Sequence, residues 1–403
     1  MDNLIQIYRR LLEEITPSYD REFYRHFKMD NRCVGVIGAR GVGKTTFLIH
    51  YLRKKYGDSE KGLYVSGDNL FFSEHTLVEV ADQFVKLYAG ELLCIDEIHK
   101  YKNWNQELKN IFDSYPRLQI IFSGSSSIDL IKGKYDLSRR VIVRQMYGFS
   151  FREYLEQKTG NKYPLLSLSE IVSGVNKVER EVGKTERLLG YLQDYLKKGY
   201  YPSSNAIRTY DAFRDTLIGI IDKTVFEDVS SFYALKTGNL EVLKKIIYFF
   251  ATSPPGSMSI NKLAKSLQKD HATITEYVQI LRDTGLLRFL LIDKYGHALV
   301  RNAEKVFLDN TNLLYAVNAG IGKEANIGSM RELFVISSLE NAGYTVFYSK
   351  DADVMCEQYL FEIGGAPKTG KQIKSLANAH LVKDDILYRS FQTIPLYLFG
   401  FLS

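Results

Sequence analysis

The first 150 residues alternate short apolar runs with longer amphipathic stretches. Each apolar run ends in a glycine, a serine or a carboxylate, and the residues that follow have apolar positions at helical spacing. Short runs that are apolar throughout are typical of strands buried on both faces of a parallel sheet. The pattern predicts an α/β domain over residues 1–150, with strands at 33–37, 62–68, 92–95 and 118–122.

Residues 151–237 have a different pattern, in which apolar and charged positions recur at helical spacing and no convincing strand is visible. The segment Tyr200-Tyr201-Pro202 interrupts the helices once, because proline disfavours helix in the residue before it. We therefore expect a helical lid or connector here.

Residues 238–307 are predicted to form three helices and a hairpin, the order of a winged helix-turn-helix. In the DNA-binding interpretation the third helix, capped by Asp270, would enter the major groove of a duplex. The residues of this helix that are candidates to face outward include Glu276 and Asp283, and the helix carries few cations. Strong binding of DNA phosphates needs more positive charge than this. The pattern favours a module that packs between domains or subunits, with duplex DNA binding as the alternative.

The tail, residues 308–403, is predicted to be a second α/β domain. An amphipathic helix at 329–344 precedes three consecutive strands between 345 and 366, and a last apolar run at 394–402 reads as a terminal strand.

Composition and charge narrow these expectations. A chain of 403 residues suggests about two to four domains. The net charge of +6 permits nucleic acid as a partner without predicting it.

The nine-residue apolar run at 394–402 is far shorter than the roughly 20 residues of a membrane helix, so no membrane association is expected. Cys33, Cys94 and Cys356 lie far apart, which favours buried free thiols and a cytoplasmic location.

The segment after the first predicted strand fits the phosphate-binding pattern GxxxxGK[ST] at every fixed position. Backbone N–H groups of such a loop, together with the start of the next helix, bind phosphate oxygens. The lysine reaches the β and γ phosphates and the hydroxyl that follows binds Mg²⁺. The sequence thus predicts a site for ATP and Mg²⁺ made by Gly38, Ala39, Arg40, Gly41, Val42, Gly43, Lys44, Thr45 and Thr46.

The run LLCI is followed by Asp96 and Glu97, which supply the second half of a nucleoside-triphosphatase site. The carboxyl end of a buried parallel strand opens beside the phosphate loop. Asp96 is therefore expected to hold Mg²⁺ together with Thr45, and Glu97 to polarise the attacking water. His99 deserves notice because it lies beside this pair.

Two further groups are candidates for sensing the γ phosphate. Ser123 and Ser125 end the next strand, and Ser125 is favoured as the sensor, although a serine-glycine turn that caps a helix is an equal alternative. Arg139 and Arg140 could act as an arginine finger, in the same or a neighbouring subunit, or could be surface or salt-bridged arginines.

The segments GARGVGKTTFL, LLCIDEIHKYKNW, IFSGSSS and DLSRR…FSFREYL resemble a family of bacterial and archaeal AAA-type ATPases that carry a C-terminal domain of unknown function similar to PD-(D/E)xK nucleases. The resemblance implies a core sheet of five parallel strands, hydrolysis residues at Lys44, Thr45, Asp96 and Glu97, a sensor near Ser125, and an arginine near Arg140 that acts across a homo-oligomer.

The nuclease resemblance implies a site in the tail. Active members place an Asp on one strand and Glu-x-Lys on the next, so that two carboxylates hold Mg²⁺. Asp353 and Glu362 match the two carboxylates, and Glu332 adds a third from the helix. The lysine position is occupied by Gly364, although Lys368 or Lys371 could swing in from the loop. The loss of this lysine favours an inactive, nuclease-like binding or docking fold.

The sequence as a whole predicts four segments. They are an AAA-type P-loop ATPase core at 1–150, a helical lid at 151–237, a winged helix at 238–307 and a nuclease-like domain at 308–403. Two functions remain open. One is a Mg²⁺-dependent ATPase that moves or remodels nucleic acid, and the other is an ATP-dependent switch whose tail docks a protein partner.

Overall fold

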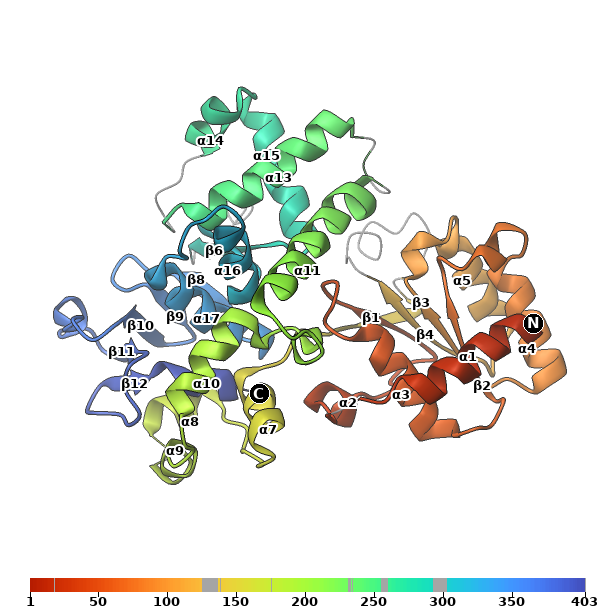
Figure 1. Ribbon diagram of the computed structural model, residues 1–403, viewed down its shortest axis with the longest axis horizontal. Helices are drawn as coiled ribbons and strands as arrows, with labels where there is room; N and C mark the ends of the chain where they lie inside the picture. The colour runs from red at the N-terminus through yellow and green to blue at the C-terminus, as the bar shows by residue number, and fades with distance from the viewer. Residues whose placement is uncertain are drawn as a thin grey trace. The chain divides into compact units, whose positions relative to one another are not determined.

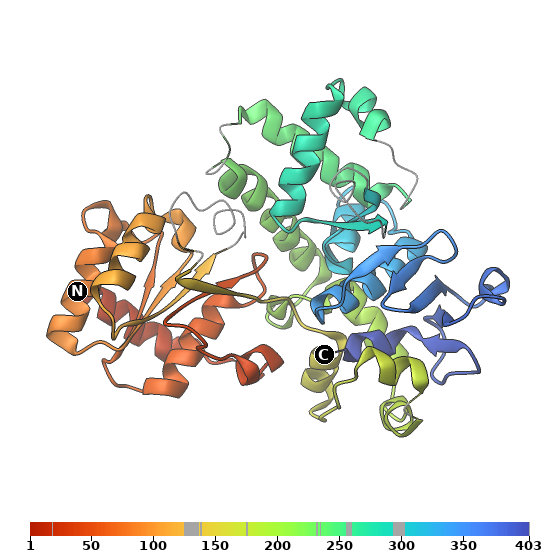
Figure 2. The ribbon, with the colours of Figure 1, turned by 180° about the vertical axis from the view of Figure 1, so that it is seen from behind.

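The computed structural model describes residues 1–17, 19–124, 137, 139–174, 176–230, 233, 235–254, 260–292 and 303–402. The chain forms two compact units, Met1–Tyr147 and Gly148–Ser403. Each unit contains its own sheet (Figures 1 and 2).

The sheet of Met1–Tyr147 has five strands in the order β2-β3-β4-β1-β5, and every neighbouring pair is parallel. This confirms the predicted five-stranded parallel sheet. β1 and β3 are buried along their whole length, which explains why their sequences are apolar throughout. The strands are β1 (Cys33–Ile37), β2 (Gly62–Ser66), β3 (Leu92–Asp96), β4 (Gln119–Gly124) and β5 (Val141–Gln145).

The helices of this unit follow the strands in the expected alternation. α1 packs on β2 and α3, and α3 contacts β2, β3 and β4, whereas α4 and α5 pack on each other. The capping box of α4, in which Thr76 and Glu79 exchange hydrogen bonds, fixes where that helix begins. The helices are α1 (Asp2–Glu14), α2 (Glu22–His26), α3 (Lys44–Tyr56), α4 (Leu77–Tyr88) and α5 (Trp104–Ser114).

The part of Gly148–Ser403 that precedes its sheet is mainly helical, as the sequence predicts. Two stretches, Tyr195–Gly199 and Thr224–Val229, are π-helical. The helices before β6 are α7 (Phe151–Thr159), α8 (Leu168–Ser173), α9 (Asn176–Gly183), α10 (Leu188–Asp194), α11 (Tyr210–Lys223), α13 (Thr237–Thr252), α14 (Ile260–Leu267) and α15 (His271–Asp283).

A seven-stranded mixed sheet in the order β12-β11-β10-β9-β8-β6-β7 completes this unit. The hairpin β6–β7 continues into the rest of the sheet because β6 pairs in parallel with β8. The proposed winged-helix and nuclease-like segments thus share one sheet, and the boundary at 307 stays a prediction. The strands are β6 (Leu287–Ile292), β7 (Ala303–Leu308), β8 (Val346–Tyr348), β9 (Val354–Cys356), β10 (Tyr359–Gly364), β11 (Ala379–Lys383) and β12 (Thr393–Pro395).

The prediction of a strand over the whole apolar run at 394–402 is wrong. Only Thr393–Pro395 is a strand, and Leu396–Phe401 forms a buried 3₁₀ helix that packs on α17 (Ile327–Asn341) and α7. Periodicity does not distinguish a short buried helix from a short buried strand, because every position is apolar in both. α16 (Thr311–Gly320) precedes α17. All three cysteines are buried and free, as the sequence predicts.

Candidate functional site

The phosphate loop connects the end of β1 to the start of α3, as the motif requires. Gly43 adopts φ 101°, a left-handed conformation that favours glycine. A Cβ on Gly38 would lie 2.2 Å from the backbone oxygen of Met146, so no other residue fits there without a shift of the backbone. Both glycines are therefore required by geometry, and the turn they make directs the first residues of α3 toward the loop.

Lys44 lies in the first turn of α3 and is almost fully buried. Its ammonium donates hydrogen bonds to the backbone oxygens of Gly38, at 2.9 Å, and Ala39, at 3.0 Å. The lysine thus reaches back over the loop to the place where the motif puts phosphate. Thr45 and Thr46 continue the helix, and Arg40, Gly41 and Val42 lie within the loop.

Arg21 anchors this loop, and sequence reasoning did not identify it. Its buried guanidinium donates to the backbone oxygens of Val42, at 2.8 Å, and Tyr147, at 2.9 Å. A single arginine before a short helix carries no sequence signal of such a role.

Asp96 is the centre of the carboxylate half of the site. It is 2% exposed and its carboxylate accepts hydrogen bonds from Thr45 Oγ1 at 2.6 Å, from Tyr64 OH at 2.8 Å and from Ser123 Oγ. Burial and the nearby Asp96 charge raise the pKa of Tyr64, so its hydroxyl stays protonated and donates. The structure therefore brings Thr45 and Asp96 into contact, as predicted for a shared metal site.

Glu97 follows with φ 46°, a left-handed conformation that is costly for a residue with a side chain. Its N–H donates to Ser123 Oγ at 3.0 Å, which helps to hold this conformation. Its Oε2 atom is buried, makes no hydrogen bond, and lies 3.4 Å from His99 Nε2. Strain of this kind accumulates at functional sites.

Ser123 is fully buried and links the carboxylate of Asp96 to the backbone N–H of Glu97. The sequence placed Ser123 and Ser125 at this edge and favoured Ser125 as the sensor. Ser125 lies outside the described residues, so that prediction is untested. The contacts of Ser123 show that it positions both Asp96 and Glu97.

The two candidate finger arginines differ in their surroundings. Arg140 makes a bidentate ion pair with Asp113 of the same chain, at 2.9 and 3.0 Å. Arg139 is exposed. A finger that acts on a neighbour's nucleotide has to be accessible, so Arg139 is the better candidate, and this role stays a prediction.

The site falls within a segment that matches a known domain. Residues 30–155 match the model of a family described as an AAA domain. This segment is similar to AAA domains and is called the AAA domain below. The AAA domain contains the phosphate loop, Asp96, Glu97 and both arginines, so the predicted resemblance is confirmed for this part of the chain. The nuclease resemblance of the tail stays a prediction.

The sequence similarity to other proteins extends well beyond the AAA domain. The uncharacterized protein MJ1637 of Methanocaldococcus jannaschii is 26% identical over 382 residues, which cover 87% of this chain and 79% of that protein. An uncharacterized protein of Haemophilus influenzae is 24% identical over 362 residues, with 81% and 82% covered. The solved structure of AMPPCP-bound DnaA from Aquifex aeolicus is 17% identical, covers 69% of this chain and 86% of that chain, and has a TM-score of 0.26, too low to support an argument.

The donor set of the AAA domain fits Mg²⁺. Mg²⁺ prefers oxygen ligands and usually takes one or two protein groups plus phosphate and water. Thr45 and Asp96 supply a hydroxyl and a carboxylate that already lie 2.6 Å apart. These two residues would hold the ion.

A second polar cluster lies in Gly148–Ser403, where the structure brings Glu332, Asp353 and Glu362 together through two lysines. Lys305 Nζ lies 2.7 Å from Glu332 and 3.7 Å from Asp353. Lys368 Nζ lies 3.1 Å from Asp353 and 2.7 Å from Glu362. Negative and positive groups therefore alternate along the cluster.

Lys368 changes the sequence interpretation of the tail. The motif lysine is replaced by Gly364, but a Cβ on Gly364 would lie 2.2 Å from Lys368 Cδ. The stem of Lys368 therefore fills the space beside Gly364, and its ammonium also donates to the backbone oxygen of Ile363 at 2.8 Å. The cation is thus present at the cluster, supplied by Lys368 from the loop, the alternative that the sequence left open to loss of the motif lysine. Burial opposes protonation of Lys368, but its ion pairs with Glu362 and Asp353 raise its pKa overall.

Lys305 was not identified from the sequence, because it lies on β7, before the segment that resembles a nuclease. Burial raises the pKa of Glu332, and Lys305 opposes that shift. Among the residues that the structure describes, no group of three or more His, Cys, Asp or Glu side chains could hold a metal ion.

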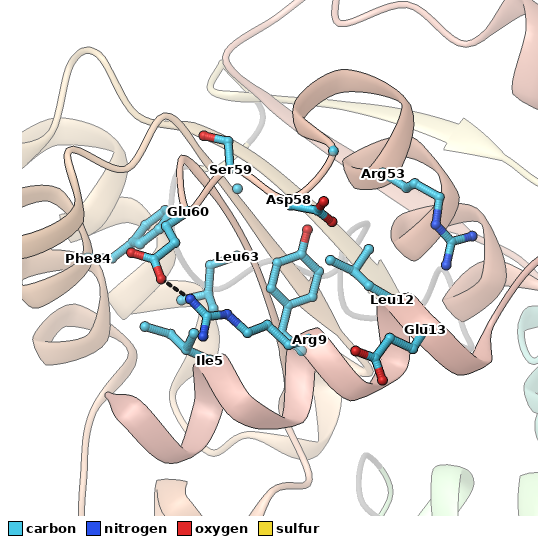
Figure 3. Close-up of a pocket in the computed structure, with 13 residues that line it drawn as sticks. Ile5, Arg9, Leu12, Glu13, Arg53, Asp58, Ser59, Glu60, Leu63 and Phe84 are labelled. Carbon is cyan, nitrogen blue, oxygen red and sulfur yellow. Dashed lines mark hydrogen bonds and ion pairs between the residues drawn. The ribbon is translucent and has the colours of Figure 1, made fainter.

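A hollow of about 440 Å³ in Met1–Tyr147 is lined by residues outside the phosphate loop (Figure 3). Its lining comes from α1, the end of α3, the chain up to the start of β2 and Phe84 of α4, and Arg9 forms an ion pair with Glu60 there. Arg53, at its edge, is nine residues along α3 from Lys44, or about 14 Å of helix. None of the predicted nucleotide-binding residues lines this hollow.

Across the described ranges, no helix is both long and apolar enough to cross a membrane.

Proposed function

We propose that the protein binds ATP and hydrolyses it with Mg²⁺, and that the nucleotide state changes the conformation of the chain beyond the AAA domain. The observation that carries the proposal is the contact between Thr45 and Asp96 at 2.6 Å, beside a phosphate loop whose lysine is already directed over it. This is the arrangement that P-loop hydrolases use to hold Mg²⁺ next to the β and γ phosphates.

The residues would divide the chemistry as follows. Loop N–H groups and Lys44 would bind the phosphates, and Thr45 and Asp96 would hold the metal. Bound Mg²⁺ would neutralise charge that develops on the phosphates. Glu97 accepts the proton of the attacking water, and Ser123 fixes Glu97 by accepting its N–H. The buried Oε2 atom of Glu97 accepts no hydrogen bond, which suits it to accept a proton from water, and His99 Nε2 lies 3.4 Å from it.

The test is the dependence of hydrolysis on the Thr45 hydroxyl. Thr45→Val keeps the shape of the side chain but removes the oxygen, and we expect phosphate release with Mg²⁺ to fall by about tenfold to a hundredfold, the usual effect of losing a hydrogen bond to a charged group. Thr45→Ser keeps the hydroxyl and should retain most activity. Equal activity in the two variants, or wild-type hydrolysis that survives EDTA, would argue against the proposal.

We also propose that the tail does not cleave nucleic acid. Support comes from the two ammonium groups that already form ion pairs with the three carboxylates, since a metal would have to displace Lys305 or Lys368 to bind there.

We expect supercoiled plasmid to stay intact with the purified protein and Mg²⁺ or Mn²⁺. Metal-dependent nicking that disappears in Asp353→Ala would overturn this proposal, and nicking that persists in that variant would indicate a contaminant.

The work that hydrolysis drives has two candidates. In one, nucleic acid is moved or remodelled, and in the other, ATP toggles a docking surface for a protein partner. Among the residues of α15, His271, Glu276 and Arg282 are exposed, a mixed set that gives little support to duplex binding by this helix. Stimulation of ATP hydrolysis by DNA or RNA, lost at high salt, would favour the first candidate. Indifference to nucleic acid, with ATP-dependent capture of one specific protein, would favour the second.

A further inference from the structure

A hollow of about 620 Å³ in Gly148–Ser403 is separate from the sites described above. Its walls come from the end of α10 and the π-helical turn after it, from the start of α11, from α16 and from the start of α17. The π-helical turn contacts α10 and α16, and α16 also contacts α11 and α17; the four helices are labelled in Figure 1. The volume lies within the range of roughly 300–1,000 Å³ that is usual for ligand sites.

Positive charge predominates in this hollow. Lys197 and Lys198 lie on the π-helical turn, and Lys323 follows α16, and all three are exposed. The acidic residues of the lining are Asp194 and Glu324, and the carboxylate of Asp194 lies 3.9 Å from the guanidinium of Arg187. Three lysines against two carboxylates, one of them already close to an arginine, leave a net attraction for anions.

Two aromatic rings accompany the lysines. Tyr210 and Tyr315 are both half-buried in the lining, and Lys197 Nζ lies 6.0 Å from the centre of the Tyr315 ring. Burial raises the pKa of both tyrosines, so their hydroxyls stay protonated at neutral pH. A planar ring with a cation at its face is a surface on which a nucleobase can stack while its phosphate meets the cation.

The starts of two long helices add to the attraction for phosphate. α17, with 15 residues, begins in the lining at Ile327, and its first turn contains no acidic residue. α11, with 14 residues, begins at Tyr210, and the acidic residue of its first turn, Asp211, is paired with Arg214 at 2.8 Å. The N-terminal end of a helix carries a partial positive charge that favours anions.

We propose that this hollow binds a nucleotide unit, with the phosphate against the three lysines and the start of α17 and the base against Tyr315. The site is distinct from the phosphate loop and does not depend on hydrolysis there. An acidic peptide would satisfy the lysines but would leave the tyrosine face without a planar partner. The same chemistry is offered by a free mononucleotide and by one unit of a single-stranded nucleic acid.

The test uses the full chain with Lys44→Ala, without Mg²⁺, so that the phosphate loop contributes least. Fluorescence anisotropy of a labelled 20-nucleotide oligothymidine measures single-strand binding, with AMP and polyglutamate as competitors. We expect Lys197→Gln combined with Lys323→Gln to weaken oligonucleotide binding at least tenfold and to lower the slope of log affinity against log salt by about 0.7 per lysine. Tyr315→Leu should weaken binding about fivefold to a hundredfold, the range for loss of one stacked base.

Lys223→Gln is the control for Lys197→Gln and Lys323→Gln taken singly, since Lys223 is an exposed lysine at the other end of α11 and each of these substitutions removes one positive charge. If the oligonucleotide binds strongly and AMP displaces it poorly, the natural ligand is a single-stranded nucleic acid. If AMP binds as tightly as the oligonucleotide, the natural ligand is a mononucleotide. The proposal is overturned if neither probe binds, if the lysine variants behave like Lys223→Gln, or if polyglutamate competes as well as nucleic acid. Circular dichroism melting of Tyr315→Leu separates lost stacking from lost folding, and the exposed lysine variants test the site without that complication.

Discussion

The Lys44→Ala variant is expected to lose ATP hydrolysis and most of its affinity for ATP. The Lys44 ammonium is almost fully buried and is held over the phosphate loop by the backbone oxygens of Gly38 and Ala39. Removal of this charge takes away a cation that the motif directs to the β and γ phosphates, and hydrogen bonds to charged groups are worth about 1.5–3 kcal/mol each. Calorimetric titration with ATP and release of phosphate measure the two effects.

The matched control is Lys54→Ala, because Lys54 is an exposed lysine on the same helix, and this variant should behave like wild type. Lys44→Met keeps the aliphatic stem and guards against a loss of folding in the alanine variant. Wild-type hydrolysis in both Lys44 variants would exclude the phosphate loop as the site of the reaction.

The Glu97→Gln variant is expected to bind ATP with nearly unchanged affinity and to hydrolyse it about 10²- to 10⁴-fold more slowly, the usual contribution of a general base. Glutamine keeps the size of the side chain, and the backbone bond from Glu97 N–H to Ser123 is unaffected, but the amide cannot accept the proton of water. Single-turnover hydrolysis and retention of ATP during gel filtration measure the two properties.

Glu91→Gln provides the comparison, since Glu91 is an exposed glutamate just before β3 and undergoes the same loss of charge. If Glu97→Gln instead loses ATP affinity while each bound ATP is hydrolysed at the wild-type rate, Glu97 is a structural residue and another group activates the water.

The parts of the fold that could be predicted are those whose signals are local. A strand buried on both faces must be apolar along its length, so the runs that became β1 and β3 were visible in the sequence. The phosphate loop was visible because its glycines are demanded by a turn of fixed shape. The 3₁₀ helix at Leu396–Phe401 was predicted as a strand because burial on all sides removes the periodicity that distinguishes the two.

The residues that sequence reasoning missed act across long separations. Tyr64 looked like one more residue of an apolar strand, and only the parallel pairing of β2 with β3 brings its hydroxyl to Asp96. Lys305 lies on β7, 48 residues before Asp353. Lys368 was considered only as a substitute from the loop, and what makes room for it is the missing side chain of Gly364.

Arg21 has a consequence for how a bound nucleotide is sensed. Its guanidinium holds the backbone oxygens of Val42, in the phosphate loop, and of Tyr147, the residue with which the first unit ends. If Val42 and Tyr147 moved apart, the buried guanidinium of Arg21 would lose a hydrogen bond to one of their backbone oxygens. The phosphate loop and the segment at Tyr147 are therefore expected to move together. Binding or release of a nucleotide at the phosphate loop is then thermodynamically linked to the position of the Tyr147 peptide, after which the chain continues into the second unit. Such linkage is reciprocal, so a restraint placed on that exit peptide should alter ATP affinity by the same factor by which ATP alters the restraint.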